Sequence, residues 1–327
     1  MFTKKLLTIL AFSLLLSGLS IDVTAQKEEK PKPRQRENVR LMTIPISIFT
    51  KEELKKNRAD EFIEAGNLIV KEDKEDQEIL SIRSVSSQPL ALAILIQDDL
   101  SSNFNLQLKD IAEFIRTLPE GSRVMVGYIR GGTMQVRQKF TRDLDKASKS
   151  LRVVLSTNSA APRSPYDGVI SALKRFKSIP TGRQAILLIS DGLDVSQGFR
   201  SSSPAQSNDL ARAILRAQRS GVAVYSFYAS ATYTESGNTI LVGNGQGSLL
   251  RLSEETGGKA FFSGRFTAIS YQPFFRDLTL ALNRQFALTY LSTHMDKGYH
   301  EVEVISTNPE VRIEHPKGYY YKKPKFR

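Results

Sequence analysis

The sequence predicts an α/β protein built on a doubly wound, mostly parallel sheet. From about residue 89 to residue 286, apolar runs of strand length alternate with segments that repeat apolar residues at helical spacing. Strands that are apolar on both faces are typical of parallel sheets covered by helices on both sides. With 327 residues and 40% hydrophobic content, the chain is long enough to bury such a core.

The elements of this domain follow from the same pattern. The expected strands are 90–96, 124–129, 134–140, 185–189, 222–227 and 260–262, and a hairpin joins the second and third of them across the turn 130–133. The expected helices are 108–118, 144–155, 169–176, 210–218, 249–255 and 273–282. The glycine-rich stretch 243–248 is expected to be a flexible loop, because Ser248 stands where a dinucleotide-binding fingerprint needs glycine or alanine.

Two β-rich flanks bracket the α/β domain. Residues 39–86 contain strand-like runs at 39–46, 68–70 and 79–82, with a short helix expected at 51–65. Residues 287–327 contain two more runs and a basic tail, and a further strand is expected at 286–291. A small sheet is marginal in water by itself, so the flanks are expected to join as one small β subdomain beside the domain at 88–286.

The N-terminus has the order of a secretion signal. Lys4 and Lys5 precede an apolar run at 6–19. The run has about 14 residues, whereas a membrane-spanning helix needs roughly 20. Residues 1–25 are therefore predicted to be a cleaved signal peptide, followed by a disordered basic and proline-containing tether at 26–38. The protein is expected to be exported, either periplasmic or secreted, without stable membrane insertion after cleavage.

Composition excludes several kinds of chemistry. The chain has no cysteine, so neither a disulfide framework nor a cysteine nucleophile is possible. His294, His300 and His315 lack helical ligand spacing and are expected to be solvent-facing strand residues. No hydrolase nucleophile motif accompanies them, so the protein is not expected to be an enzyme. A formal net charge of +12 favours a partner protein with an acidic surface, and export makes nucleic acid the least expected partner.

Three polar loops occupy the places where a ligand is expected. In a doubly wound sheet, the binding crevice lies at the carboxyl ends of the strands, where the strand order reverses. Segment 97–103 follows the first strand and segment 190–194 follows the fourth, while loop 163–168 lies immediately before a helix. The crevice is therefore expected to be lined by these three loops.

Two stretches resemble a known family. Residues 186–192 read Ile-Leu-Leu-Ile-Ser-Asp-Gly, and residues 249–262 read Leu-Leu-Arg-Leu-Ser-Glu-Glu-Thr-Gly-Gly-Lys-Ala-Phe-Phe. They are similar to the fourth-strand motif and to the late helix and strand of von Willebrand factor type A (vWA) domains. The chain most resembles the vWA-related family known largely from acidobacterial genomes, over nearly all of the chain after the predicted signal peptide. The resemblance implies a Rossmann-like vWA domain at 88–286.

The resemblance also implies a metal-ion-dependent adhesion site. In vWA domains this site takes an Asp-x-Ser-x-Ser loop after the first strand, a threonine from a middle loop and an aspartate after the fourth strand. Oxygen ligands of this kind suit a hard divalent ion such as Mg²⁺. Asp191 matches the fourth-strand aspartate, whereas Ser164 is only the nearest hydroxyl to the missing threonine.

The first loop of this chain departs from the family pattern, and two registers remain open. With Asp98 at position one, position three is Leu100, which cannot bind a metal. With Asp99 at position one, positions three and five are Ser101 and Asn103, both of which carry oxygen. The candidate ligands of this degenerate site are Asp98, Asp99, Ser101, Asn103, Ser164 and Asp191.

The resemblance implies a binding function. We expect an exported, non-enzymatic binding or adhesion module that presents the carboxyl-end face of its sheet to a partner protein, with Mg²⁺ in the degenerate site as the candidate ion. The alternative is a structural component of the cell envelope with an inert vWA crevice.

Overall fold

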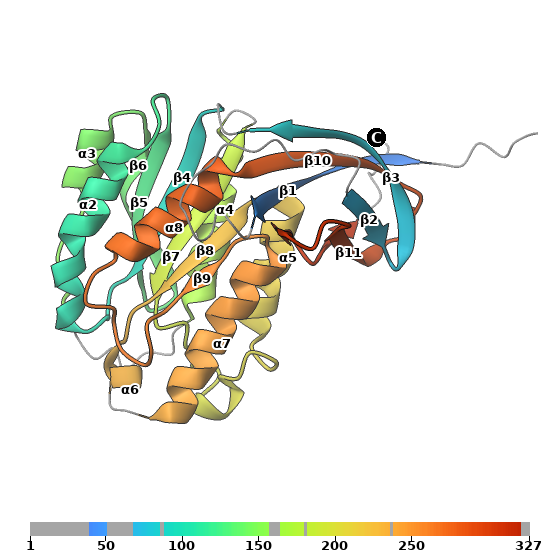
Figure 1. The fold of residues 1–327 in the computed structure, drawn as a ribbon. Coiled ribbons are helices and arrows are strands. Elements are labelled where there is room, and N and C mark those ends of the chain that lie inside the picture. Colours follow the sequence, from blue (N-terminus) through green and yellow to red (C-terminus); the bar gives the residue numbers. More distant parts are fainter. Residues whose placement is uncertain are drawn as a thin grey trace, which may run out of the picture. The chain divides into compact units, whose positions relative to one another are not determined.

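A computed structural model of the chain describes residues 39–50, 68–85, 88–156, 164–179, 182–235 and 238–321. The described residues belong to one compact unit, Asn38–Arg327 (Figure 1). The predicted signal peptide and tether, the helix expected at 51–65 and the basic tail from residue 322 lie outside the described residues. No helix among the described residues is both long enough and apolar enough to cross a membrane.

A mostly parallel sheet forms the centre of the α/β part. Its strand order is β6-β5-β4-β7-β8-β9. The strands are β4 (Leu90–Gln97), β5 (Arg123–Arg130), β6 (Thr133–Thr141), β7 (Arg183–Ser190), β8 (Ala223–Tyr228) and β9 (Ala260–Phe261). All neighbours pair in parallel except β5 and β6, which form the expected hairpin. The strand order reverses at β4, which has β5 on one side and β7 on the other, so the predicted doubly wound sheet is confirmed.

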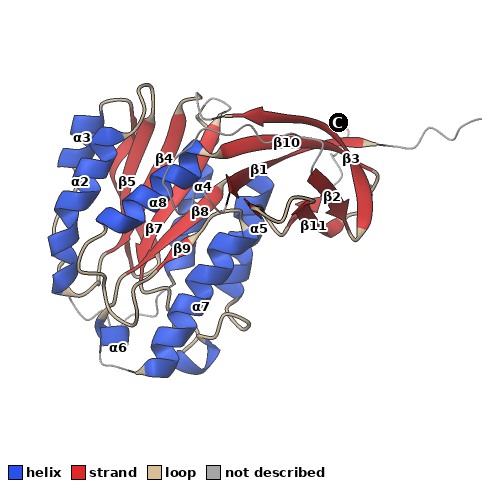
Figure 2. Cartoon of the chain, viewed as in Figure 1, coloured by secondary structure: helices blue, strands red, loops and turns tan. Residues whose placement is uncertain are grey.

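Helices cover both faces of this sheet (Figure 2). One face packs against α2 (Leu108–Thr117), α3 (Leu144–Lys149) and α8 (Gln272–Asn283), and the other against α4 (Pro165–Phe176), α5 (Asn208–Ser220) and α7 (Thr239–Glu255). Leu92 and Leu95 of β4 are both fully buried, yet they belong to different core clusters. Residues three apart on a strand point to opposite faces, so the continuous apolar run of β4 serves two cores.

A seven-stranded antiparallel sheet unites the two ends of the described chain, in the order β12-β1-β10-β3-β2-β11-β13. Its strands are β1 (Arg40–Thr50), β2 (Leu68–Glu72), β3 (Glu75–Ser84), β10 (Gln285–Ser292), β11 (Gly298–Ser306), β12 (Val311–Glu314) and β13 (Gly318–Tyr321). β1 and β3 pair with β10, and β2 pairs with β11, so strands of both flanks share hydrogen bonds. The sheet is larger than the small subdomain that the sequence suggested. The bounds 39–86, 88–286 and 287–327 remain predictions.

The helix expected at 144–155 is shorter than predicted, because a tertiary contact ends it. α3 stops at Lys149, and the chain then runs toward Tyr128 on β5. The backbone N–H of Arg152 donates to the Tyr128 hydroxyl at 2.8 Å, and that hydroxyl donates to the Arg152 carbonyl at 2.8 Å. These bonds replace the helical hydrogen bonds that Arg152 would otherwise make.

The prediction of a flexible loop at 243–248 is wrong, because these residues lie inside α7. The Asn238 side chain caps the helix by accepting hydrogen bonds from the backbone N–H groups of Ile240 and Leu241. A Cβ atom added to Gly245 would lie 2.1 Å from the carbonyl oxygen of Asp191. The glycine therefore lets the helix backbone pack directly against the loop after β7, a contact that helical periodicity does not reveal.

His315 is not the solvent-facing residue that the sequence suggested. Its ring is half-buried between the strands, with Nε2 3.3 Å from the Val304 backbone N–H and Nδ1 3.0 Å from the Pro316 carbonyl. A neutral ring that donates from Nδ1 and accepts at Nε2 satisfies both contacts. Burial lowers the pKa of His315 below its ordinary value, and the Pro316 carbonyl opposes that shift only in part.

This pKa predicts a pH-dependent loss of stability. The unfolded chain binds a proton at His315 as the pH falls through about 6.5, whereas the folded chain resists protonation until a lower pH. The free energy of unfolding should therefore decrease as the pH falls from 6.5 toward the folded-state pKa. In urea unfolding between pH 7.5 and 5.5, we expect His315→Gln to lose part of the decrease that the wild type shows. An identical pH dependence in the two proteins would contradict this account.

Candidate functional site

The carboxyl edge of the six-stranded sheet brings the loops after β4 and β7 together at one amide group. Gln97, the last residue of β4, donates from Nε2 to Asp99 Oδ1 at 3.0 Å. Its Oε1 accepts from the Ser190 hydroxyl at 2.5 Å and from the Asp191 backbone N–H at 3.2 Å. All four side chains are buried. Asp99 and Asp191, which are distant in sequence, therefore meet at this edge as expected.

The loop after β8 joins the same edge. Asp191 is fully buried, and its carboxylate accepts from the Leu193 backbone N–H at 3.1 Å and from the Thr234 hydroxyl at 3.5 Å. Thr234 lies in the short helix α6 (Thr232–Glu235) after β8. The Ser101 backbone N–H donates to the Ser230 carbonyl at 2.9 Å, and the two hydroxyls lie 3.4 Å apart. Ser101 thus faces the loop after β8.

Asp98 has a different environment from Asp99. The Arg152 guanidinium donates to both of its carboxylate oxygens, at 2.7 and 2.9 Å. The same guanidinium lies over the Tyr128 ring, 4.2 Å from the centroid. Hydrogen bonds to Asp98 raise the pKa of Arg152, so the arginine stays charged. Of the two registers left open, the geometry brings Asp99, and not Asp98, to the amide that also binds Asp191.

Ser164 and Asn103 differ in burial. Asn103 is exposed on the short 3₁₀ helix η2 (Ser102–Gln107). Ser164 precedes α4 and is buried, and its hydroxyl oxygen has no hydrogen-bond partner among the described residues. The first turn of α4 is hydrogen-bonded to the loop after β7, because the Tyr166 hydroxyl donates to the Gly192 carbonyl at 2.6 Å. A buried hydroxyl without a partner is costly and requires an explanation.

The edge is rich in carboxylates although the chain as a whole is basic. Asp194 is buried and accepts from the side chain and backbone of Ser196. Asp167 pairs with Arg212 at 3.1 Å, and burial together with the neighbouring Asp209 raises the pKa of Asp167. The described carboxylates of the edge are Asp98, Asp99, Asp167, Asp191, Asp194 and Asp209. Locally, the site is suited to a cation.

The donor set fits a hard divalent ion in part. Asp99 and Ser101 offer oxygen atoms from the loop after β4, and Asp191 offers them from the loop after β7. The Ser164 hydroxyl, which has no hydrogen-bond partner among the described residues, lies in a third loop. Asp98 is already neutralised by Arg152, and Asn103 is exposed on η2. The assignment of all six residues as metal ligands stays a prediction.

Sequence reasoning missed a second polar cluster, in the seven-stranded sheet. One ligand atom each of Glu72, Asp73 and His300 lies within 4.8 Å of the others, an arrangement that could hold a metal ion. His300 is only 4% exposed, so its expected place on a solvent-facing strand surface is wrong. The signal was present in the sequence, because residues two apart on a strand share one face, which puts His300 on the same face of β11 as the inward-facing Val302 and Val304.

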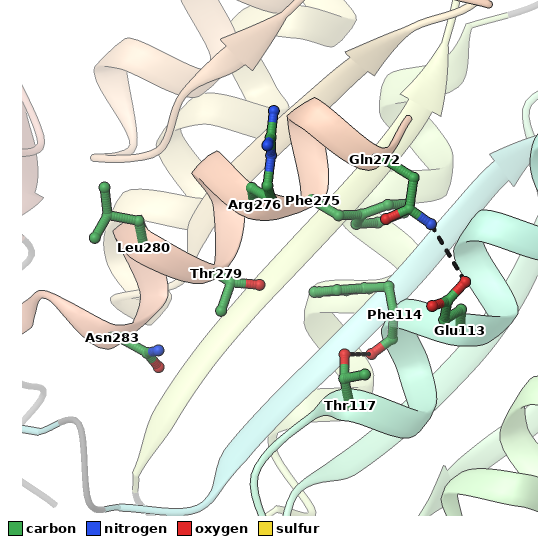
Figure 3. Close-up of a pocket in the computed structure, with 9 residues that line it drawn as sticks. All are labelled: Glu113, Phe114, Thr117, Gln272, Phe275, Arg276, Thr279, Leu280 and Asn283. Atoms are coloured by element: carbon green, nitrogen blue, oxygen red, sulfur yellow. Dashed lines mark hydrogen bonds between the residues drawn. The ribbon is translucent and has the colours of Figure 1, made fainter. Parts of the chain in front are cut away.

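A groove of about 410 Å³ lies between α2 and α8 (Figure 3). Phe114 and Phe275 stack in it with ring centroids 4.3 Å apart. Gln272 donates to Glu113 at 3.3 Å across its rim. None of the carboxyl-edge residues lines this groove, so it is separate from the candidate site.

Comparisons with known proteins give likenesses of fold. No protein-family model and no curated protein matches the chain. A vWA protein from Catenulispora acidiphila has 11% sequence identity and a TM-score of 0.41, over 80% of this chain and 75% of that chain. An aerotolerance-related membrane protein from Bacteroides fragilis has 12% identity and a TM-score of 0.43, over 59% of this chain and 98% of that chain.

A third likeness is the von Willebrand factor domain of a type V pilus tip protein from Porphyromonas gingivalis. It has 12% identity and a TM-score of 0.38, over 60% of this chain and 93% of that chain. The solved structures that are similar to the chain include vWA-type domains. To that extent, the vWA resemblance of the sequence is confirmed. With TM-scores below 0.5, none of these likenesses assigns a ligand or a partner to this chain.

Proposed function

We propose that the chain is an exported, non-enzymatic binding or adhesion module of vWA type. It holds a partner protein at the carboxyl edge of the six-stranded sheet, and acts in the periplasm or outside the cell. The observation that carries this proposal is the meeting of the Asp99 and Asp191 loops at the Gln97 amide. The edge is where the strand order reverses, which is the binding position in doubly wound folds.

Mg²⁺ is the ion that we assign to this edge. Asp99, Ser101, Ser164 and Asp191 would hold it, because carboxylates and hydroxyls are the ligands that hard cations prefer. Once bound, the ion supplies an open coordination position for a carboxylate of the partner. The Asp98–Arg152 pair then serves to fix the loop after β4 rather than to bind the ion.

The charge distribution favours an acidic partner. The formal net charge of +12 attracts an acidic protein surface over long range. At short range the carboxylate-rich edge would repel that surface unless a cation lies between them. Metal-dependent capture of an acidic protein reconciles these two facts, and the proposal includes no nucleic acid and no stable membrane insertion.

A structural envelope component with an inert crevice is the alternative. It is supported by the internal hydrogen bonds of the edge, since Asp98, Asp99 and Asp191 all accept bonds within the described chain. The two functions differ in whether partner capture depends on metal and on these carboxylates.

Capture from cell-envelope extract distinguishes the two functions. The immobilised chain should retain a partner in Mg²⁺ and release it in EDTA, and Asp191→Asn should abolish retention. Asp145→Asn is the matched control, because Asp145 is exposed on α3, away from the carboxyl-edge loops, and forms an exposed ion pair with Arg116. Retention that is equal in EDTA, in Mg²⁺ and in the Asp191→Asn variant would contradict the binding proposal and favour the structural one.

A further inference from the structure

The cluster at Glu72, Asp73 and His300 has the composition of a transition-metal site. These residues come from both ends of the described chain: Glu72 ends β2, Asp73 begins the turn to β3, and His300 lies on β11. His294, in the loop between β10 and β11, lies beside them with its ring centroid 5.8 Å from that of His300. The cluster is separate from the carboxyl edge of the other sheet and forms no part of the proposed function.

The β2–β3 turn aims the Asp73 side chain at β11. Asp73 and Lys74 both have positive φ, 49° and 73°, as in the tight two-residue turns of hairpins. Asp73 Oδ1 accepts from the Glu301 backbone N–H at 2.8 Å, and Oδ2 lies 2.7 Å from His300 Nδ1. Left-handed backbone at two residues that are not glycine is strained, so contacts such as those of Asp73 with β11 must stabilise this turn.

The buried carboxylate of Glu72 can accept more hydrogen bonds, or bind a cation, beyond the contacts that it makes. Its side chain is fully buried, and Oε1 accepts from the hydroxyls of Tyr319 and Ser292. Its other oxygen, Oε2, has no hydrogen-bond partner among the described residues. A buried carboxylate oxygen normally finds a donor or a cation, because its desolvation is costly. The Arg40 guanidinium reaches only to 4.0 Å from Oε1.

The two histidines are oriented as metal ligands are. His300 Nε2 lies 2.9 Å from the Asp296 carbonyl, which leaves Nδ1 directed at Asp73 and 3.7 Å from Glu72 Oε1. Histidine ligands commonly donate their other ring N–H to a backbone carbonyl in this way. His294 Nδ1 is buried without a hydrogen-bond partner among the described residues, 3.7 Å from Glu72 Oε1.

The distances suit a small tetrahedral ion. In a tetrahedral Zn²⁺ site, two ligand atoms lie about 3.3–3.6 Å apart, since each bond measures about 2.0–2.2 Å. The separations of 2.7 Å and 3.7 Å from His300 Nδ1 lie on either side of this distance, so side-chain rotations would bring the ligand atoms to it. Imidazole nitrogens favour Zn²⁺ and similar transition metals over Mg²⁺ and Ca²⁺.

We propose that Glu72, Asp73, His294 and His300 bind one Zn²⁺ ion, which links the turn of the N-terminal β2–β3 hairpin to the C-terminal strand β11 and the loop before it. In a chain without cysteine, this ion supplies the cross-link that a disulfide cannot. Because the ligands converge only in the folded chain, binding stabilises the native state.

Calorimetric titration with ZnCl₂ tests the site in the purified full chain after treatment with EDTA and dialysis. We expect saturable binding of one Zn²⁺ per chain at this cluster, and a tetrahedral absorption spectrum when Co²⁺ replaces it. His300→Ala should weaken binding at least about tenfold, since even loss of a supporting residue costs that much. His294→Ala should do the same with less effect on the sheet, because His294 lies in the loop between β10 and β11 and its ring is more exposed than that of His300.

Two matched controls separate this site from other metal binding. Asp191→Asn alters the carboxyl edge of the other sheet and should leave Zn²⁺ affinity unchanged. His315→Gln removes a histidine between β12 and β13 that is not part of the cluster, and should also leave the Zn²⁺ affinity unchanged. The proposal is overturned if the wild type shows no saturable Zn²⁺ binding, or if His300→Ala and His294→Ala bind Zn²⁺ as tightly as the wild type.

Discussion

Gly245→Ala should destabilise the protein by about 3 kcal/mol or more, because overpacking against backbone leaves little room for relief. The added Cβ atom would lie 2.1 Å from the Asp191 carbonyl oxygen and 3.2 Å from its carbonyl carbon. Relief requires α7 or the loop after β7 to move, and that loop carries the candidate site. The free energy of unfolding in urea measures the loss.

Gly243→Ala is the matched control on the same helix, and its effect should have the opposite sign. A Cβ atom at Gly243 meets nothing within 4 Å, and the position is exposed inside α7. Alanine is favoured over glycine in an exposed helix interior by about 0.5–1 kcal/mol, so this variant should be more stable than the wild type. Equal effects of the two substitutions would show that Gly245 does not make the close contact described.

Arg152→Met should cost about 3 kcal/mol, because it leaves the Asp98 carboxylate buried without its cation. Asp98 is 3% exposed and receives two hydrogen bonds from the guanidinium. Methionine keeps much of the apolar side-chain stem, so most of the loss should be electrostatic. Adding Asp98→Asn to this variant removes the unpaired charge and should recover a large part of the stability.

Arg116→Met provides the contrast for this prediction. Arg116 and Asp145 also form an ion pair, at 3.1 Å, but their side chains are 48% and 69% exposed. Exposed pairs of this kind contribute about 0–1 kcal/mol. If both arginine substitutions changed the free energy of unfolding by the same small amount, the buried pair would not hold the loop after β4 in place.

The strands of the α/β domain were predictable because their residues obey a local rule. β4 and β7 are continuous apolar runs, which only a sheet covered on both faces can bury. The bounds of α3 and the glycine-rich first half of α7 were not predictable, because both depend on contacts with residues distant in the sequence. Arg152 leaves its helix for Tyr128 and Asp98, and Gly245 accepts its helical position because Asp191 packs against it.

The residues of the two candidate sites also differ in how far the sequence could predict their positions. The meeting of the Asp99 and Asp191 loops followed from strand order, which places both loops at one edge. The role of Asp98 could not be predicted, since its partner Arg152 lies 54 positions away along the chain. The cluster around His300 needed the register of β2 against β11, because Glu72 and His300 meet only across those paired strands.

Thermal unfolding of the full chain in Mg²⁺ and in EDTA tests the central claim most directly, that the carboxyl edge of the six-stranded sheet holds a metal ion. An ion that binds only the native state adds about 2.7 kcal/mol of stability at a concentration 100 times its Kd. We expect Mg²⁺ to raise the Tm of the wild type and of Asp145→Asn, and to leave the Tm of Asp99→Asn and Asp191→Asn unchanged. His300→Ala should keep the response, because its cluster favours Zn²⁺. A wild-type Tm that is the same in Mg²⁺ and in EDTA, or an undiminished rise in the Asp191→Asn variant, would contradict the assignment.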